Sequence, residues 1–142
     1  MFYGSFAHNL DEKGRLMSPR KMRDELGLQA FIMKGYDGAL SIYKKEKFEA
    51  LVEQINSLPQ NLKSSRDFVR VQLASVRDLD VDKLGRVQIP AQLLEKYQIG
   101  KAVYVIGVGD HIEVWDAKAY DQYESDADNR FEDIAEHLND NR

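Results

Sequence analysis

The sequence predicts an α+β fold with a mainly β core, in which one structural unit occurs twice. The pattern Asp-x-x-Gly-Arg stands at residues 11–15 and again at residues 82–86. Each copy is followed by a proline, by a segment with helical spacing of apolar residues, and by two apolar runs that flank a glycine-containing turn. This order is typical of a helix followed by a β-hairpin, and its recurrence indicates an internal duplication.

Each basic turn can be explained by its residue types. Glycine takes a positive φ without strain, so Gly14 and Gly85 mark the tight bends. An aspartate at the start of a turn accepts hydrogen bonds from backbone N–H groups further along. The arginine after each glycine is then presented at a turn and is not buried in a core. The residues expected to form the two turns are Asp11, Gly14, Asp82 and Gly85.

The first copy reads as strand, turn, short strand, helix and hairpin. Pro19 suits the first position of a helix because its missing N–H costs nothing there, and Gly27 ends the segment. Met22 and Leu26 are four residues apart and should face the core. The expected elements are a strand at 2–10, the turn at 11–15, a helix from Pro19 to Gly27, and strands at 30–33 and 39–43.

The second copy repeats this order after two connecting helices. The connecting segment has helical spacing from Lys44 to Pro59, and a further helix is expected from about Asn61 to Leu73. In the second copy we expect strands at 76–82, 87–89, 102–106 and 111–115 and a helix at 90–97. Helices at 116–124 and 131–138 should follow, and residues 139–142 should fray.

The duplication also predicts the domain organisation. The motif copies are offset by 71 residues and the hairpins by 72, which places one inserted residue near Gly100. Each copy has about 45 residues before its trailing helices, too few to bury a stable core alone, so the copies should pack on each other or intertwine. The expected units are repeat 1 (5–47), connecting helices (48–75), repeat 2 (76–119) and an acidic helical segment (120–142).

Composition excludes several classes of site. The 142 residues include no cysteine, so no disulfide or zinc–thiolate site can form. No apolar run is long enough to span a membrane and no signal peptide is evident, so we expect a cytoplasmic protein. The net charge is −4, but residues 110–142 hold eleven acidic and three basic residues, which leaves +4 on residues 1–109. This division predicts a basic working face and an acidic outer face.

The motifs resemble those of the MraZ family of bacterial regulators of the division and cell-wall gene cluster. The resemblance covers nearly the whole chain and is carried by three segments: Phe2-x-Gly4, Asp11-x-Lys13-Gly14-Arg15, and Asp82-x-x-Gly85-Arg86-x-x-Ile89-Pro90. It implies two AbrB/SpoVT-like swapped-hairpin β-barrels with flanking helices. It further implies a nucleoid-associated transcription factor that forms a ring-like homo-oligomer, such as an octamer, and binds repeated promoter boxes upstream of its own operon.

The same resemblance implies that Arg15 and Arg86 contact double-stranded DNA, with Lys13 beside the first. The chain departs from the family pattern at Leu84, which stands where Lys13 stands in the first copy, and the nearest lysine is Lys83. The second loop therefore contacts DNA less directly or serves assembly. Three cations of the first helix either contact phosphate or form an ordinary solvated face: Arg20, Lys21 and Arg23.

The physical case for DNA rests on charge and geometry. Arginine presents a rigid fork of donors that suits phosphate or guanine. Two to four cations per subunit would bind DNA only weakly at physiological salt. In a symmetric oligomer, each further loop would meet the same DNA at a roughly millimolar effective concentration, so oligomerisation is part of the hypothesis.

Other functions remain as alternatives. An antitoxin-like partner-binding module would use residues 119–142 to fold onto a toxin, and a structural ring protein would use the hairpins for assembly alone. We expect no enzyme activity, cofactor, metal site or small-molecule substrate, because no catalytic or ligand spacing is present. The aromatic residues Tyr43, Phe48, Trp115 and Tyr120 are expected in the core or at a subunit interface.

Overall fold

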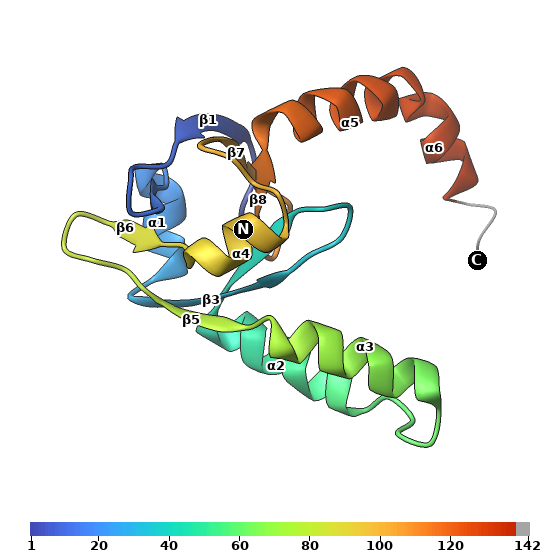
Figure 1. Ribbon diagram of the computed structural model, residues 1–142. Helices are drawn as coiled ribbons and strands as arrows, with labels where there is room; N and C mark the ends of the chain where they lie inside the picture. Colours follow the sequence, from blue (N-terminus) through green and yellow to red (C-terminus); the bar gives the residue numbers. More distant parts are fainter. Residues whose placement is uncertain (139–142) are drawn as a thin grey trace.

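The computed structural model describes residues 1–138 and has the mixed α+β architecture with a mainly β core that the sequence predicts (Figure 1). The strands are β1 (Ser5–Asn9), β2 (Arg15–Met17), β3 (Gln29–Lys34), β4 (Leu40–Lys44), β5 (Arg77–Asp80), β6 (Arg86–Gln88), β7 (Ala102–Gly107) and β8 (Ile112–Asp116). The helices are α1 (Arg20–Leu26), α2 (Lys45–Asn56), α3 (Lys63–Ala74), α4 (Ala91–Lys96), α5 (Ala117–Asn129) and α6 (Phe131–His137).

The sheet is built by strand exchange between the two copies. Within the described residues, six strands form one antiparallel sheet in the order β1-β7-β8-β4-β3-β5. Strand β1 of the first copy pairs with β7 of the second, and β5 of the second copy pairs with β3 of the first. The two hairpins meet through β4 and β8. When each strand is replaced by its counterpart from the other copy, the same strand order results, read from the opposite edge of the sheet. The prediction that the copies intertwine is confirmed.

Strands β2 and β6 form a separate two-stranded ribbon, to which each copy contributes one strand. Its register pairs Arg15 with Gln88, Leu16 with Val87, and Met17 with Arg86. The central pair is buried, with Leu16 0% and Val87 2% exposed. The ribbon closes a core that the sheet, α1 and α4 also line, and Met22 and Leu26 of α1 face it as expected. One core therefore serves both copies.

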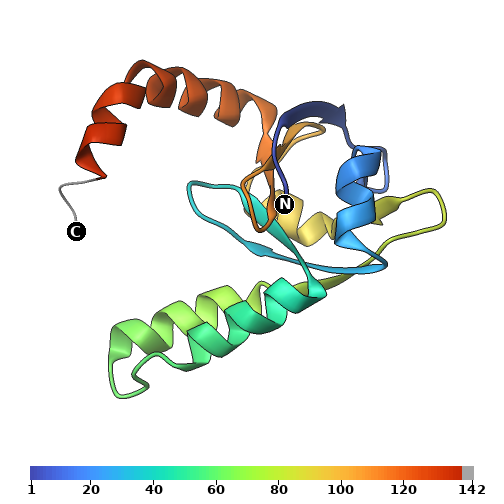
Figure 2. The same cartoon turned by 180° about the vertical axis from the view of Figure 1, so that it is seen from behind.

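Two helical arms extend from this core (Figures 1 and 2). Helices α2 and α3 run side by side as an antiparallel hairpin, and α5 and α6 form a second arm at the C-terminal end. None of the residues in α3, α5 or α6 is buried, whereas α2 buries Ile55. The arms thus leave most of their apolar side chains at the surface.

Aromatic side chains attach the first helix of each arm to the preceding hairpin. Phe48 of α2 stacks on Phe31 with ring centroids 4.1 Å apart, and Tyr120 of α5 meets Trp115 edge-on at 5.2 Å. Trp115 is buried and Tyr43 is half-buried. Trp115 therefore lies in the core, as one of the two predicted locations, and the half-buried Tyr43, Phe48 and Tyr120 pack beside the hairpins, which leaves a subunit interface open for them.

The boundaries of two strands differ from those predicted. The strand expected at 2–10 is limited to β1. Gly4 takes a φ of +94° and separates β1 from Phe2, which forms an isolated β-bridge with Gly109. The strand expected at 76–82 is limited to β5, because Asp82 already begins the basic turn.

Helix boundaries differ as well. Pro19 and Pro90 stand one residue before their helices, with ψ of 146° and 131°, and not at the first helical position. The helix expected at 116–124 continues to Asn129, because residues 125–129 contain neither glycine nor proline. The α3 helix begins at Lys63, two residues later than expected.

Two predictions stay open. The expected fraying of residues 139–142 lies outside the described residues. The division into units at 5–47, 48–75, 76–119 and 120–142 also stays a prediction. Over residues 1–138, no helix combines the length and the apolar character that a membrane crossing requires.

We expect Leu40→Ala to lower the free energy of unfolding by about 2 to 5 kcal/mol, since large-to-small changes at fully buried sites cost that much. Leu40 is 0% exposed in β4, at the junction of the two hairpins. The matched control is Leu28→Ala, whose side chain is 84% exposed and should cost less than about 0.5 kcal/mol. Urea unfolding at fixed protein concentration measures both, and equal costs would contradict a shared core at this junction.

Candidate nucleic-acid interface

The first basic loop is held by one carboxylate. Asp11 Oδ1 accepts hydrogen bonds from the backbone N–H groups of Lys13 and Arg15, both at 2.9 Å. The Gly14 N–H donates to the Asp11 carbonyl at 2.9 Å. Gly14 has a φ of +74°, and a Cβ there would stand 2.8 Å from the Ile89 carbonyl oxygen. Both the conformation and the close approach therefore require glycine.

The second loop has the same bonds. Asp82 Oδ1 accepts from the N–H groups of Leu84 at 2.9 Å and Arg86 at 2.8 Å. The Gly85 N–H donates to the Asp82 carbonyl at 2.9 Å, and Gly85 has a φ of +82°. Leu84 thus occupies the structural position of Lys13, as the spacing of the two motifs indicated.

Each loop aspartate also orients its own arginine. The Arg15 Nε donates to Asp11 Oδ2, and the Arg86 Nε donates to Asp82 Oδ2 at 2.9 Å. The two arginine side chains are 30% and 29% exposed. Within residues 1–138, no hydrogen bond occupies the Nη groups of either arginine. The Nη edge of each guanidinium is therefore available for a phosphate or a guanine edge, and the bond from Nε to the aspartate fixes its orientation.

The ribbon fixes the two loops relative to each other. Because β2 and β6 are antiparallel, Arg15 and Arg86 begin their strands at opposite ends of the ribbon. Both loops lie on the side of the molecule opposite α5 and α6, where the 82–85 loop forms the outermost yellow-green projection (Figures 1 and 2). Both arginines border one hollow together with Asp78 and Asp80, so the hollow itself has mixed charge. Each loop tip exposes one lysine, with a glutamate beside it in the first loop.

The structure separates the three cations of α1. Arg20 is exposed. The Lys21 ammonium contacts the Tyr3 hydroxyl and lies 4.5 Å from the centre of its ring. Arg23 is half-buried and its Nη1 donates to the Leu84 carbonyl at 3.1 Å, so α1 contributes a cation to the second loop. The sequence did not predict the contact with Tyr3, because 18 residues separate the two and no motif joins them.

The remaining predicted cations, Lys13 and Lys83, are exposed at the loop tips. Among residues 1–138, no three histidine or carboxylate side chains gather in a way that could hold a metal ion. Over the same residues, the two loops thus place exposed lysine side chains and free guanidinium Nη groups at the surface.

Comparison with known proteins gives the family. The family model described as "MraZ protein, putative antitoxin-like" matches residues 1–71 and 74–142. The chain belongs to the MraZ family. The two matched segments each contain one copy of the Asp-x-x-Gly-Arg motif.

Curated MraZ proteins are similar over almost their full length. A protein of Mesoplasma florum named "Transcriptional regulator MraZ" is 41% identical over 137 residues, which cover 96% of this chain and 94% of that protein. Proteins of the same name from Thermoanaerobacter sp. (strain X514) and Lactiplantibacillus plantarum are 39% and 40% identical. They cover 99% and 97% of this chain, and 98% of each relative is matched.

The loop aspartates should titrate at low pH. The N–H of Arg15 is the main cause that lowers the pKa of Asp11 below its ordinary value of 3.8, and the N–H of Arg86 acts in the same way on Asp82. A carboxylate with a lowered folded pKa contributes stability that is complete above 3.8 and is lost as pH falls through the folded pKa.

We therefore expect the side-chain carboxyl carbons of Asp11 and Asp82 to show titration midpoints below 3.8 by NMR. Asp11→Asn and Asp82→Asn identify the two signals and should weaken the loss of stability in acid. A midpoint at or above 3.8 would show that the loop hydrogen bonds do not hold the carboxylates in solution.

Proposed function

We propose that this chain is a sequence-specific regulator of transcription that binds double-stranded DNA through its two Asp-x-x-Gly-Arg loops. The observation that carries the proposal is the duplicated loop, in which a carboxylate fixes an arginine and leaves its Nη edge free. The names of the relatives, each a transcriptional regulator, support it.

We propose that its targets are repeated promoter boxes upstream of its own operon, within the division and cell-wall gene cluster. We propose that it is located at the nucleoid in the cytoplasm. DNA presents one phosphate charge about every 1.7 Å along the duplex axis, so the lysine and arginine side chains of the loops gain counterion release wherever they touch it. Arginine can also read guanine through two parallel hydrogen bonds, which gives the loops a means of sequence selection.

We propose that the chain acts as a ring-like homo-oligomer. The weak contact of one loop pair becomes useful only when several pairs bind linked boxes at high effective concentration. Two surfaces can join copies. The α5–α6 arm exposes Phe131 (68%), Ile134 (38%) and Leu138 (67%), and the α2–α3 hairpin exposes Phe68 (37%) and Val71 (54%).

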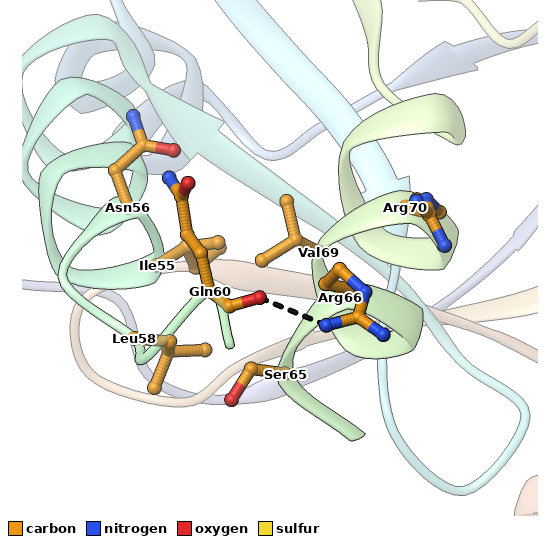
Figure 3. Close-up of a pocket in the computed structure, with 8 residues that line it drawn as sticks. All are labelled: Ile55, Asn56, Leu58, Gln60, Ser65, Arg66, Val69 and Arg70. Carbon is orange, nitrogen blue, oxygen red and sulfur yellow. Dashed lines mark hydrogen bonds between the residues drawn. The ribbon is translucent and has the colours of Figure 1, made fainter. Parts of the chain in front are cut away.

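Charge supports a contact between these two surfaces of neighbouring copies. Residues 117–137 hold seven acidic and two basic side chains, whereas α3 holds three basic side chains and one acidic one. Figure 3 shows two of these α3 cations, Arg66 and Arg70, beside a pocket that Ile55, Leu58 and Val69 line with apolar atoms. Arg66 Nη1 donates to the Gln60 carbonyl at 3.0 Å, so its charge is held at the rim. An acidic arm with apolar side chains fits such a surface.

One observation supports the antitoxin-like alternative, namely the wording of the family description. It requires the C-terminal segment to fold onto a partner protein. In the structure, residues 117–137 are already helical as α5 and α6, which favours an arm for assembly over a tail that folds on binding.

We expect Arg15→Ala to weaken binding to the upstream DNA by about 1 to 3 kcal/mol and to reduce sequence selectivity, since arginine contacts to bases carry such energies. Fluorescence anisotropy with promoter and scrambled duplexes, at two salt concentrations, measures both effects. The control is Lys96→Ala, which removes one positive charge from an exposed position of α4, outside both loops and both arms.

Unchanged binding by Arg15→Ala would refute the loop as the contact. Equal affinity of the wild type for promoter and scrambled DNA would refute sequence-specific regulation and favour the antitoxin-like or purely structural alternatives.

We expect Phe131→Glu to reduce the assembled mass, because it places a charge in an apolar contact that is already acidic. Light scattering after gel filtration should give the wild type a multiple of 16.4 kDa and the variant a smaller multiple. Leu28→Glu changes a side chain that is 84% exposed outside both arms and should leave the mass unchanged. A wild type of 16.4 kDa would show that the ring does not form.

A further inference from the structure

The offset of 71 residues pairs Arg23 of α1 with Leu94 of α4. The preceding positions, Met22 and Leu93, are 4% and 3% exposed and both enter the core, so the two helices are equivalent in the fold. At the next position the copies differ in chemistry, with a cation in the first copy and an apolar side chain in the second.

Each of these side chains packs against the loop of the other copy. Leu94 Cδ1 lies 3.4 Å from the place where a Cβ on Gly14 would stand. The Arg23 side chain fills the corresponding place at Gly85, with Cδ and Nη1 as the nearest atoms. The strand exchange of the fold thus extends to the loops, because each loop rests on a helix from the opposite copy.

The two loops are tied down by different groups. The Ile89 N–H donates to the Gly14 carbonyl at 2.9 Å and anchors the first loop through the backbone. Over residues 1–138, no equivalent backbone bond reaches the Gly85 carbonyl. The second loop is anchored by the Arg23 Nη1 bond to the Leu84 carbonyl instead. Among the described residues, Arg23 Nε is buried without a hydrogen-bond partner, so the Nη1 bond is what holds the guanidinium at the loop.

The exchange of chemistry enlarges the charge difference between the two loops. At the tips, Glu12 and Lys13 of the first loop correspond to Lys83 and Leu84 of the second. The first loop therefore carries two cations and two acids. The second loop, once Arg23 is added, carries three cations and one acid, although its own segment lacks the lysine of the family pattern.

Resting on the function proposed above, we infer that Arg23 is a DNA-phosphate contact that α1 of the first copy supplies to the second loop. It adds a third cation to Lys83 and Arg86 of that loop. Its Nη1 bond orients the guanidinium, and no hydrogen bond among the described residues occupies Nη2. The second loop is then the more strongly basic contact of the pair, and the two loops of one subunit are not equivalent on DNA.

The test separates charge from loop anchoring with two variants. Arg23→Leu introduces the residue that stands at position 94, so the apolar packing is kept. Arg23→Gln keeps a donor for the Leu84 carbonyl and removes only the charge. Lys96→Leu is the matched control, because it removes one positive charge from an exposed position of α4, the equivalent helix, outside both loops. Circular dichroism confirms that each variant is folded.

The measurement is the slope of log affinity against log salt concentration for the upstream duplex. Each lost phosphate contact lowers the magnitude of this slope by about 0.9. We expect both Arg23 variants to lose about 0.9 per engaged subunit, and Lys96→Leu to keep the wild-type slope.

Either of two results overturns the inference, and the behaviour of the wild type separates its failure from that of the proposed function. A wild-type slope for Arg23→Gln, with or without a loss in Arg23→Leu, shows that Arg23 only anchors the loop. An equal loss in Lys96→Leu shows a general effect of net charge. If the wild type binds selectively and depends on Arg15 while the Arg23 variants are unchanged, this inference alone fails. If the wild type shows no selective binding, the proposed function fails with it.

Discussion

The pairing of Leu16 with Val87 holds the structure together at the point where the two copies meet. Each copy gives one short strand to this ribbon, and the buried pair at its centre closes the core that the six-stranded sheet leaves open. Burial of two such side chains contributes about 1.5 to 3 kcal/mol each. Since the sheet edges β1 and β5 also belong to exchanged strands, neither copy can keep its core without the other.

This constraint explains the position of the loops. Each basic loop joins an exchanged strand to a ribbon strand: the first connects β1 to β2 and the second connects β5 to β6. Its ends are therefore fixed by contacts with the opposite copy, and its interior is fixed by one aspartate that accepts from two N–H groups and from an arginine Nε. The arginines lie on rigid supports, so the chain loses little conformational entropy when their Nη groups bind a ligand.

Duplication within one chain allows the two loops to diverge. In a symmetric dimer of identical units, a change at one loop appears at both. Here Lys13 and Leu84 differ, and so do the side chains behind the loops, Leu94 and Arg23. The two differences meet at the second loop in space although they are distant in sequence. The α2–α3 and α5–α6 arms have diverged further, with a basic excess on α3 and an acidic excess on the C-terminal arm.

The sequence by itself determined the repeated unit, the turns and most elements, because these depend on local spacing and on residues with special backbone properties. Gly14 and Gly85 take positive φ, Met22 and Leu26 face the core, and the repeat offset correctly placed Leu84 on Lys13. Boundaries were less accurate, as at Gly4 and at the end of α5, since fraying and continuation of an element depend on its neighbours.

Only the tertiary structure decided which copy each strand joins and which side chain lies behind each loop. Strand partners are chosen by long-range burial, and a sequence of alternating apolar residues does not specify them. For the same reason, the sequence identified Arg23 only as one of three cations on a helix face. Its contact with a loop about 60 residues away follows from the strand exchange, which brings the helix of one copy against the loop of the other.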